Sequence, residues 1–180
     1  MQKSLRVAAV LLIVTTALVG CSKEKSTEAE DSFSFVVYPG AQYLPHLTEV
    51  TKQAHKVITP GNAEIPPTAI YDSDASVEDV ANFYAKSYGY GKVAPDATNN
   101  LSAAKPAAYY RNGDLQTDVQ GIVSLLQKMK LTTDITRAQG QYKAADIEAK
   151  PNRPRVTVQR PYFDVTTSQV VNRTLILMSR

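Results

Sequence analysis

The N-terminal segment limits how this chain can fold, because it has the features of an export signal and contains the only cysteine. Lys3 and Arg6 precede an apolar run over residues 7–19, which Gly20-Cys21 closes. A positive start, an apolar stretch of about 7–15 residues and a small-residue cleavage site define a secretory signal. The run is shorter than the ~20 residues that cross a bilayer as a helix. A single cysteine allows no intramolecular disulfide, so the fold must be held by its core alone.

Leu18-Val19-Gly20-Cys21 resembles the lipobox of bacterial lipoproteins. In that family a diacylglycerol is attached to the cysteine thiol, the preceding peptide is removed, and the new amine is acylated. The resemblance implies that Cys21 is lipidated, that residues 1–20 are removed, and that the lipid holds the protein at a membrane. Several acyl chains, at ~0.8 kcal/mol per buried CH₂, hold far more firmly than one. In Gram-negative lipoproteins, Ser at the position of Ser22 is compatible with transfer to the outer membrane, so its periplasmic face is favoured.

Residues 22–32 contain no large apolar side chain and carry mixed charge, so we expect residues 21–32 to be a lipidated cysteine with a flexible tether. By flexible-chain scaling this tether spans an r.m.s. distance of about 18 Å, which keeps the working domain close to the membrane. We expect one domain over residues 33–180. A domain of about 150 residues buries roughly 68–70% of its unfolded surface, which is enough for a core without disulfides.

Periodic apolar patterns predict two clear helices and a third, shorter one. The first covers residues 76–89, with Ser76 as its N-cap. The second opens with a capping-box pair and covers residues 117–130. Apolar residues at helical spacing favour a helix over residues 46–55 as well. We expect extended or β structure over residues 33–38, stopped by Pro39-Gly40, and over 68–72, 107–111, 155–159 and 174–178, with 164–172 connecting a terminal hairpin.

These elements predict an α+β fold, an antiparallel sheet with two or three helices packed on one face. Tyr38-Pro39-Gly40-Ala41, the Ser76-led helix carrying Phe83-Tyr84, and the closing Arg173-Thr174-Leu175-Ile176 resemble small exported bacterial lipoprotein domains of unknown function. The resemblance implies a compact α+β lipoprotein domain. It implies no reaction, ligand or catalytic residue.

The charge of the mature chain excludes a general affinity for nucleic acid. Without Lys3 and Arg6, 18 basic side chains remain against 17 acidic ones. Residues 137–180 nevertheless carry 8 basic against 3 acidic side chains. Arg153, Arg155 and Arg160 therefore offer a candidate surface for an envelope protein or an anionic glycan. The alternative is that these arginines are solvent-facing strand residues that discourage edge pairing.

Tyrosines form the second candidate surface. Tyr84, Tyr88 and Tyr90 lie in or just after the first predicted helix, and Tyr offers an apolar face with a polar tip. In one interpretation, these tyrosines line a groove that binds sugar rings or a peptide. In the other, Tyr84 and Tyr88 bury their rings along the helix and leave only the hydroxyls at the rim.

Motifs that would indicate catalysis or metal binding are incomplete. Asp72-x-Asp74-x-Ser76 opens like a calcium loop, but the glycine and glutamate that an EF-hand needs are absent. Ser102-x-x-Lys105 matches the motif of penicillin-recognising enzymes without its partner motifs, and Pro106 disfavours the helix it requires. His46 and His55 are nine residues apart and have no nearby ligand cluster. No metal or cofactor is predicted.

The sequence therefore predicts a non-catalytic, membrane-tethered lipoprotein that serves as a binding or structural module of the bacterial cell envelope. Two alternatives remain open. One is an envelope hydrolase that uses His46 or His55. The other is a carrier or sensor for a small apolar ligand or a glycan.

Overall fold

The computed structural model describes residues 35–59, 61, 64–95 and 106–180. The signal and tether over residues 1–32, including Cys21, lie outside these ranges, and so does Ser102-x-x-Lys105. None of the helices within the described ranges has both the length and the apolar character needed to cross a bilayer.

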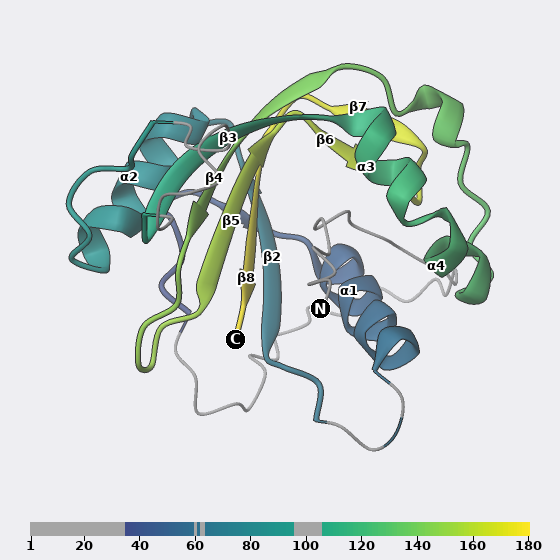
Figure 1. The fold of residues 1–180 in the computed structure, drawn as a ribbon, viewed down its shortest axis with the longest axis horizontal. Coiled ribbons are helices and arrows are strands. Elements are labelled where there is room, and N and C mark those ends of the chain that lie inside the picture. Colours follow the sequence, from purple (N-terminus) through teal and green to yellow (C-terminus); the bar gives the residue numbers. More distant parts are fainter. Residues whose placement is uncertain (1–34, 60, 62–63, 96–105) are drawn as a thin grey trace, which may run out of the picture.

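A six-stranded sheet forms the centre of the fold, and every neighbouring pair in it is antiparallel (Figure 1). The strand order is β1-β2-β8-β5-β4-β3, so the C-terminal strand β8 lies inside the sheet, as its uninterrupted apolar sequence predicts. A separate hairpin, β6-β7, interrupts the connection between β5 and β8. The strands are β1 (Gln42–Tyr43), β2 (Thr68–Ser73), β3 (Ala108–Asp114), β4 (Gln141–Ile147), β5 (Arg155–Arg160), β6 (Tyr162–Asp164), β7 (Gln169–Val171) and β8 (Thr174–Ser179).

The helices begin and end close to where their sequences predict. α2 (Val77–Ser87) has Ser76 as N-cap, and the Ser76 hydroxyl accepts a hydrogen bond from the Asp79 amide at 3.0 Å, which confirms the prediction. α1 (Pro45–Ile58) is longer than the expected helix. The predicted helix over residues 117–130 is instead two, α3 (Leu115–Gly121) and α4 (Val123–Lys128). They are followed by the short 3₁₀ helix η1 (Ile135–Arg137).

The capping box predicted at Thr117 is wrong, because Asp114 caps α3. The Asp114 carboxylate accepts hydrogen bonds from both the amide and the hydroxyl of Thr117, at 2.9 and 3.0 Å. Ile122 then leaves the helical conformation, with φ −115° and ψ 5°, and separates α3 from α4. A carboxylate one turn earlier therefore competes successfully with the Thr117-Gln120 capping box predicted from the sequence.

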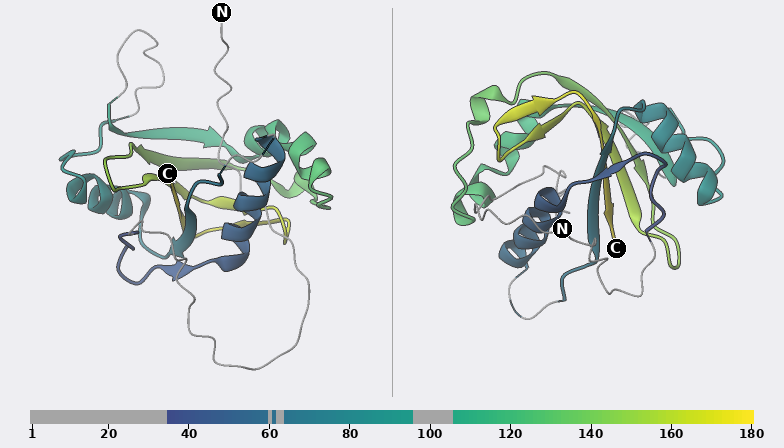
Figure 2. Two further views of the ribbon diagram at one scale, coloured as in Figure 1. Left: turned by 90° about the horizontal axis from the view of Figure 1, so that it is seen from below. Right: turned by 180° about the vertical axis from the view of Figure 1, so that it is seen from behind.

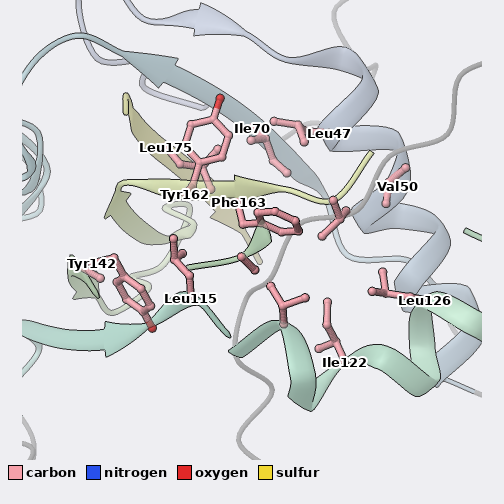
Figure 3. Packing of buried hydrophobic residues seen from close by; sticks show 14 residues of the cluster. Leu47, Val50, Ile70, Leu115, Ile122, Leu126, Tyr142, Tyr162, Phe163 and Leu175 are labelled. Atoms are coloured by element: carbon pink, nitrogen blue, oxygen red, sulfur yellow. The ribbon is translucent and has the colours of Figure 1, made fainter. Parts of the chain in front are cut away.

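Two cores lie on opposite faces of the sheet, because strand residues alternate between the faces. On one face, which we call the α2 face, α2 packs against β4, β5 and β8. On the other, which we call the open face, the apolar residues pack against α1, α3, α4 and the β6-β7 hairpin. Figure 3 shows Phe163 of the hairpin between two groups of residues. Leu47 and Val50 of α1 form one group, and Leu126 of α4 with Ile122, just before α4, forms the other.

The α+β class and the antiparallel sheet are thus confirmed, and the helices are divided between two faces rather than gathered on one. The cause is visible in β8, where Leu175 contributes to the core of the open face and Ile176 and Met178 to that of the α2 face. A strand that is apolar on both sides requires cover on both sides.

Candidate functional site

A chain of hydrogen-bonded polar side chains crosses the open face of the sheet. It consists of Asp118 of α3, Tyr142 and Asp146 of β4, Arg111 of β3 and Thr157 of β5, and we call these five residues the polar ladder. The antiparallel register pairs Tyr109 with Asp146 and Asp146 with Thr157, so neighbouring strands bring the ladder residues to one surface.

The ladder is continuous at hydrogen-bond distance. Tyr142 Oη donates to Asp118 Oδ2 at 2.5 Å and accepts from Arg111 Nη1 at 2.6 Å. Arg111 Nε donates to Asp146 Oδ2 at 2.7 Å, and the other oxygen, Oδ1, accepts from Thr157 Oγ1 at 2.8 Å. The Arg111 and Asp146 side chains are 20% and 17% exposed, so this ion pair is only partly screened by water.

Gly113 provides the space for the Tyr142 ring. The two residues are directly opposite in the β3-β4 register, and a Cβ at Gly113 would lie 2.2 Å from Cζ and from the hydroxyl of Tyr142. No larger residue fits there without moving the ring. The ring also lies under the Arg111 guanidinium, 5.4 Å from its centroid, which adds a cation–π contact to the hydrogen bond.

The electrostatics of the ladder favour fixed hydrogen bonding over proton transfer. Burial, together with the Asp118 carboxylate, raises the pKa of Tyr142 to about 12, so its hydroxyl stays protonated at neutral pH. The pKa of Arg111 is raised, because Asp146 and Tyr142 outweigh the opposing effect of its burial. Neither group supplies an acid or base that titrates near pH 7.

A second charged pair lies one row along the same face. Arg155 Nη2 contacts both oxygens of Glu148, at 2.6 and 2.5 Å, across the β4-β5 pair. Both side chains are about half exposed. Leu177 of β8, opposite the ladder residue Thr157 in the β5-β8 register, is half-buried. The open face therefore offers paired charges beside apolar surface.

The predicted tyrosine surface is mostly core. Tyr84 is fully buried, and its hydroxyl accepts a hydrogen bond from the Tyr38 amide at 3.0 Å. Tyr88 is buried as well, and its hydroxyl donates to the Pro154 carbonyl at 2.9 Å. Tyr90 is half-buried and donates to the Glu148 carbonyl at 3.1 Å. The structure thus places these rings in the core and at its rim, as the second interpretation of the tyrosines expects.

The three candidate arginines do not form one surface. Arg153 lies over the Tyr88 ring, 5.6 Å from its centroid, at the turn between β4 and β5. Arg155 lies on the open face. Arg160, an odd number of residues later on the same strand, belongs to the α2 face, and its Nη1 donates to the Asp74 carbonyl at 2.9 Å. The positive charge of the C-terminal third is thereby distributed over separate places.

Asp72 and Asp74 bind an arginine rather than forming a metal loop. Arg173 Nε donates to Asp72 Oδ2 at 2.7 Å, and the Arg173 Nη1 group contacts Asp74. Tyr162 also donates to Asp72, at 3.3 Å. Among the described residues there is no cluster of three or more potential metal ligands.

The two histidines lie on α1, with His46 exposed and His55 half-buried. His55 borders a surface hollow of about 220 Å³ together with Thr59, Glu64 and Ile65. This volume is below the ~300–1,000 Å³ typical of small-molecule pockets. The hollow therefore gives little support to either alternative function.

Sequence reasoning missed the polar ladder altogether. Its residues come from α3 and three strands, and one of these strands, β4, is not predicted from the sequence. The available signal was that two polar side chains, Tyr109 and Arg111, are two positions apart and so share one face of their strand. The partner strand has to be known before the pairing of these residues can be inferred.

Comparison with protein-family models, curated proteins and solved structures found no match.

Proposed function

We propose that this protein is a non-catalytic lipoprotein of the bacterial cell envelope, anchored through Cys21, that presents the open face of its sheet to an envelope protein. The observation that carries the proposal is the short distance between anchor and fold. Phe35 follows Cys21 by 14 residues and already packs against the core of the α2 face. A flexible chain of this length spans roughly 20 Å, so the domain works beside a membrane.

The position of the first described residues also distinguishes the two faces. The chain enters the fold next to α2, where the Tyr38 amide binds the Tyr84 hydroxyl and the Tyr38 ring contacts Phe83 (Figure 2). The open face lies on the opposite side of the sheet, away from the point where the tether enters. This is the side that a partner can approach without meeting the bilayer.

The chemistry of the open face favours a protein partner over an anionic glycan. Arg111 and Arg155 are each paired with a carboxylate, so the face has no excess of positive charge. The half-buried, apolar Leu177 of β8 lies opposite Thr157 of the ladder in the β5-β8 register. Paired charges beside apolar surface fit the mixed composition of protein–protein interfaces.

The anchor is tested by metabolic labelling with a fatty-acid analogue in cells that express the full chain. We expect label on the wild-type protein and none on Cys21→Ala. Because residues 7–19 could hold an uncleaved variant in the membrane, retention is measured on a second chain, in which a cleavable secretory signal replaces residues 1–21. This chain should be released in soluble form. Label on Cys21→Ala, or membrane retention of the second chain, would contradict the anchor.

Placement in the outer membrane has its own test. Ser22→Asp should move the protein to the inner membrane in a Gram-negative host, as measured by density fractionation of the two membranes. Ser22→Thr is the matched control and should leave the distribution unchanged. An outer-membrane location of Ser22→Asp would argue against sorting by this residue.

The partner surface is tested by in-cell photo-crosslinking. A photoreactive residue at Thr157 or Leu177 on the open face should give one discrete adduct, and the same residue at the exposed Lys86 of α2 should not. Arg111→Ala should weaken the adduct if the ladder shapes the surface. Absence of an adduct from both open-face positions, or equal adducts from all three, would overturn the assignment.

A further inference from the structure

A group of partly exposed aromatic residues surrounds the point where the chain enters the fold. Tyr38 and Phe83 are in edge-to-face contact, with ring centroids 5.2 Å apart, and Tyr43 and Tyr71 are 5.3 Å apart. Tyr43 is 49% exposed. Together with two flanking apolar residues at the start of the described chain they form what we call the aromatic patch, Phe35, Val37, Tyr38, Tyr43, Tyr71 and Phe83.

The patch belongs to the α2 side of the molecule. Tyr43 is directly opposite Tyr71 in the β1-β2 register, and Tyr71 packs against the core of the α2 face. Tyr84 lies beneath the patch, contacts Phe83 with ring centroids 5.1 Å apart and holds the Tyr38 amide. Two parts of the chain far apart in sequence, residues 35–43 and α2, are therefore fixed next to each other.

The local backbone holds the entry segment in place. Tyr38-Pro39-Gly40-Ala41 forms a turn in which the Ala41 amide donates to the Tyr38 carbonyl at 3.0 Å. Gly40 has φ +77°, the conformation that a type II turn, with Pro at its second position, requires of its third residue. The turn directs the chain from Tyr38, which packs against α2, to Tyr43 in β1. Because these contacts are made within the fold, the patch is formed before any partner binds.

We propose that the aromatic patch docks onto the interfacial region of the lipid bilayer that holds the anchor, and thereby fixes the orientation of the domain. The inference rests on the proposed lipid anchor at Cys21. Phe35 follows Cys21 by 14 positions, so a flexible chain would hold the patch at an r.m.s. distance of roughly 20 Å from the anchor. Docking then requires no encounter from solution, because the lipid surface is present at a high effective concentration.

The residue types of the patch fit this partner. Tyrosine is enriched at membrane interfaces, where its ring lies at headgroup level and its hydroxyl remains hydrated. The six patch residues carry no charge, so the docking depends on aromatic and apolar contact and is insensitive to salt. Docking through this side leaves the polar ladder, on the opposite face of the sheet, directed away from the bilayer.

The test uses the full lipidated protein in phosphatidylcholine vesicles. Because Cys21 is the only cysteine and its thiol is consumed by lipid, a cysteine introduced elsewhere is the only reactive thiol for a fluorescent label. Val37→Cys places the label in the patch, and Gln127→Cys places it on exposed α4 as control. Brominated phosphatidylcholine should quench the Val37→Cys label several-fold more than the Gln127→Cys label, at low and high salt alike.

A second substitution tests the patch itself. Tyr43→Ser, at a side chain that is half exposed, should reduce the lipid quenching of the Val37→Cys label without changing the thermal midpoint. Val170→Ser removes a similarly exposed apolar group on β7 and should leave the quenching unchanged. Equal lipid quenching at the two label positions would overturn the proposal. So would disulfide-linked dimers of the unlabelled Val37→Cys protein after mild oxidation of the free thiols, because they would show that a second copy covers the patch.

The outcome is separable from that of the anchor. If the patch does not dock, the protein still cofractionates with vesicles through its lipid while the Val37→Cys label stays accessible to a water-soluble quencher. If the anchor itself is absent, the protein does not enter the vesicles.

Discussion

Gly113 of β3 gives the sharpest test of the polar ladder, because the Tyr142 ring occupies the space that a side chain at Gly113 would need. An alanine Cβ there would lie 2.2 Å from the Tyr142 hydroxyl. In Gly113→Ala the buried Tyr142 ring must move, which costs about 1–3 kcal/mol as overpacking. The move also disturbs the hydrogen bonds of Tyr142 with Asp118 and Arg111. At about 0.5–1.5 kcal/mol each, these two hydrogen bonds bring the expected destabilisation to about 2–6 kcal/mol.

Urea denaturation of the mature chain, followed by circular dichroism, measures this loss. At about 2–4 °C per kcal/mol for a domain of this size, the same change lowers the thermal midpoint by about 4–24 °C. Gly121→Ala is the matched control, because a Cβ at Gly121, the last residue of α3, meets no atom within 4 Å. It should be neutral or stabilise by up to about 1 kcal/mol, as alanine does in a helix.

A double-mutant cycle identifies the cause. Tyr142→Leu removes the Cζ and hydroxyl atoms that a Cβ at Gly113 would meet. In that background Gly113→Ala should cost less than about 1 kcal/mol, since neighbouring substitutions couple only through the contact they share. An unchanged cost in the Tyr142→Leu background, or a Gly113→Ala variant as stable as Gly121→Ala, would refute the packing of the ring over Gly113.

Three further predictions concern buried tyrosines on both faces of the sheet and the N-cap of α2. Tyr84→Phe removes the acceptor of the Tyr38 amide, so we expect a loss of about 1–3 kcal/mol and faster hydrogen exchange at Tyr38; retained protection would contradict the contact. Burial raises the pKa of Tyr88 and of Tyr142 to about 12, above the value of about 10 in the unfolded chain. Each therefore stabilises the fold below about pH 10, and up to about 3 kcal/mol per group is lost as the pH rises to 12; a urea midpoint independent of pH in this window would disprove the burial. Ser76→Ala should cost about 1 kcal/mol in thermal unfolding, and no cost would mean that its hydroxyl does not cap α2.

Local signals explain what the sequence predicts correctly. The cap, the apolar spacing and the terminal glycine of α2 all act within a few residues of one another, so they can be recognised without knowing the fold. The same holds for the turn at Pro39-Gly40 and for β5, whose apolar residues alternate with polar ones. In each case the tertiary structure agrees with the local preference.

β4 escapes prediction because its environment, not its composition, makes it a strand. Ala144 and Ala145 are both fully buried, one in each core, so two small residues replace the expected alternation of large apolar and polar residues. Alanine has low strand propensity. Its small size allows α2 to lie close to β4, and that requirement becomes visible only in the assembled sheet.

The surface arginines and tyrosines show a related limit. Tyr84 and Tyr88 have the same helical spacing whether they face a ligand or the core. Only the packing of α2 against β4, β5 and β8 shows that they face the core. Arg155 and Arg160 are close in sequence, yet their positions on β5 differ by an odd number and so lie on opposite faces. Net charge over a segment therefore says little about a surface until the strand is known.

Long-range ion pairs supply the cross-links that a chain with one cysteine cannot make covalently. Arg173 on the approach to β8 holds Asp72 of β2, 101 residues earlier, and Tyr162 of the inserted hairpin donates to the same carboxylate. Asp72 is only 7% exposed, so removing Arg173 would leave a buried carboxylate without its cation, at a cost of about 3–5 kcal/mol. The loss of a native disulfide from a small secreted domain costs about 2–5 kcal/mol. Breaking either kind of link between distant segments therefore costs a comparable free energy.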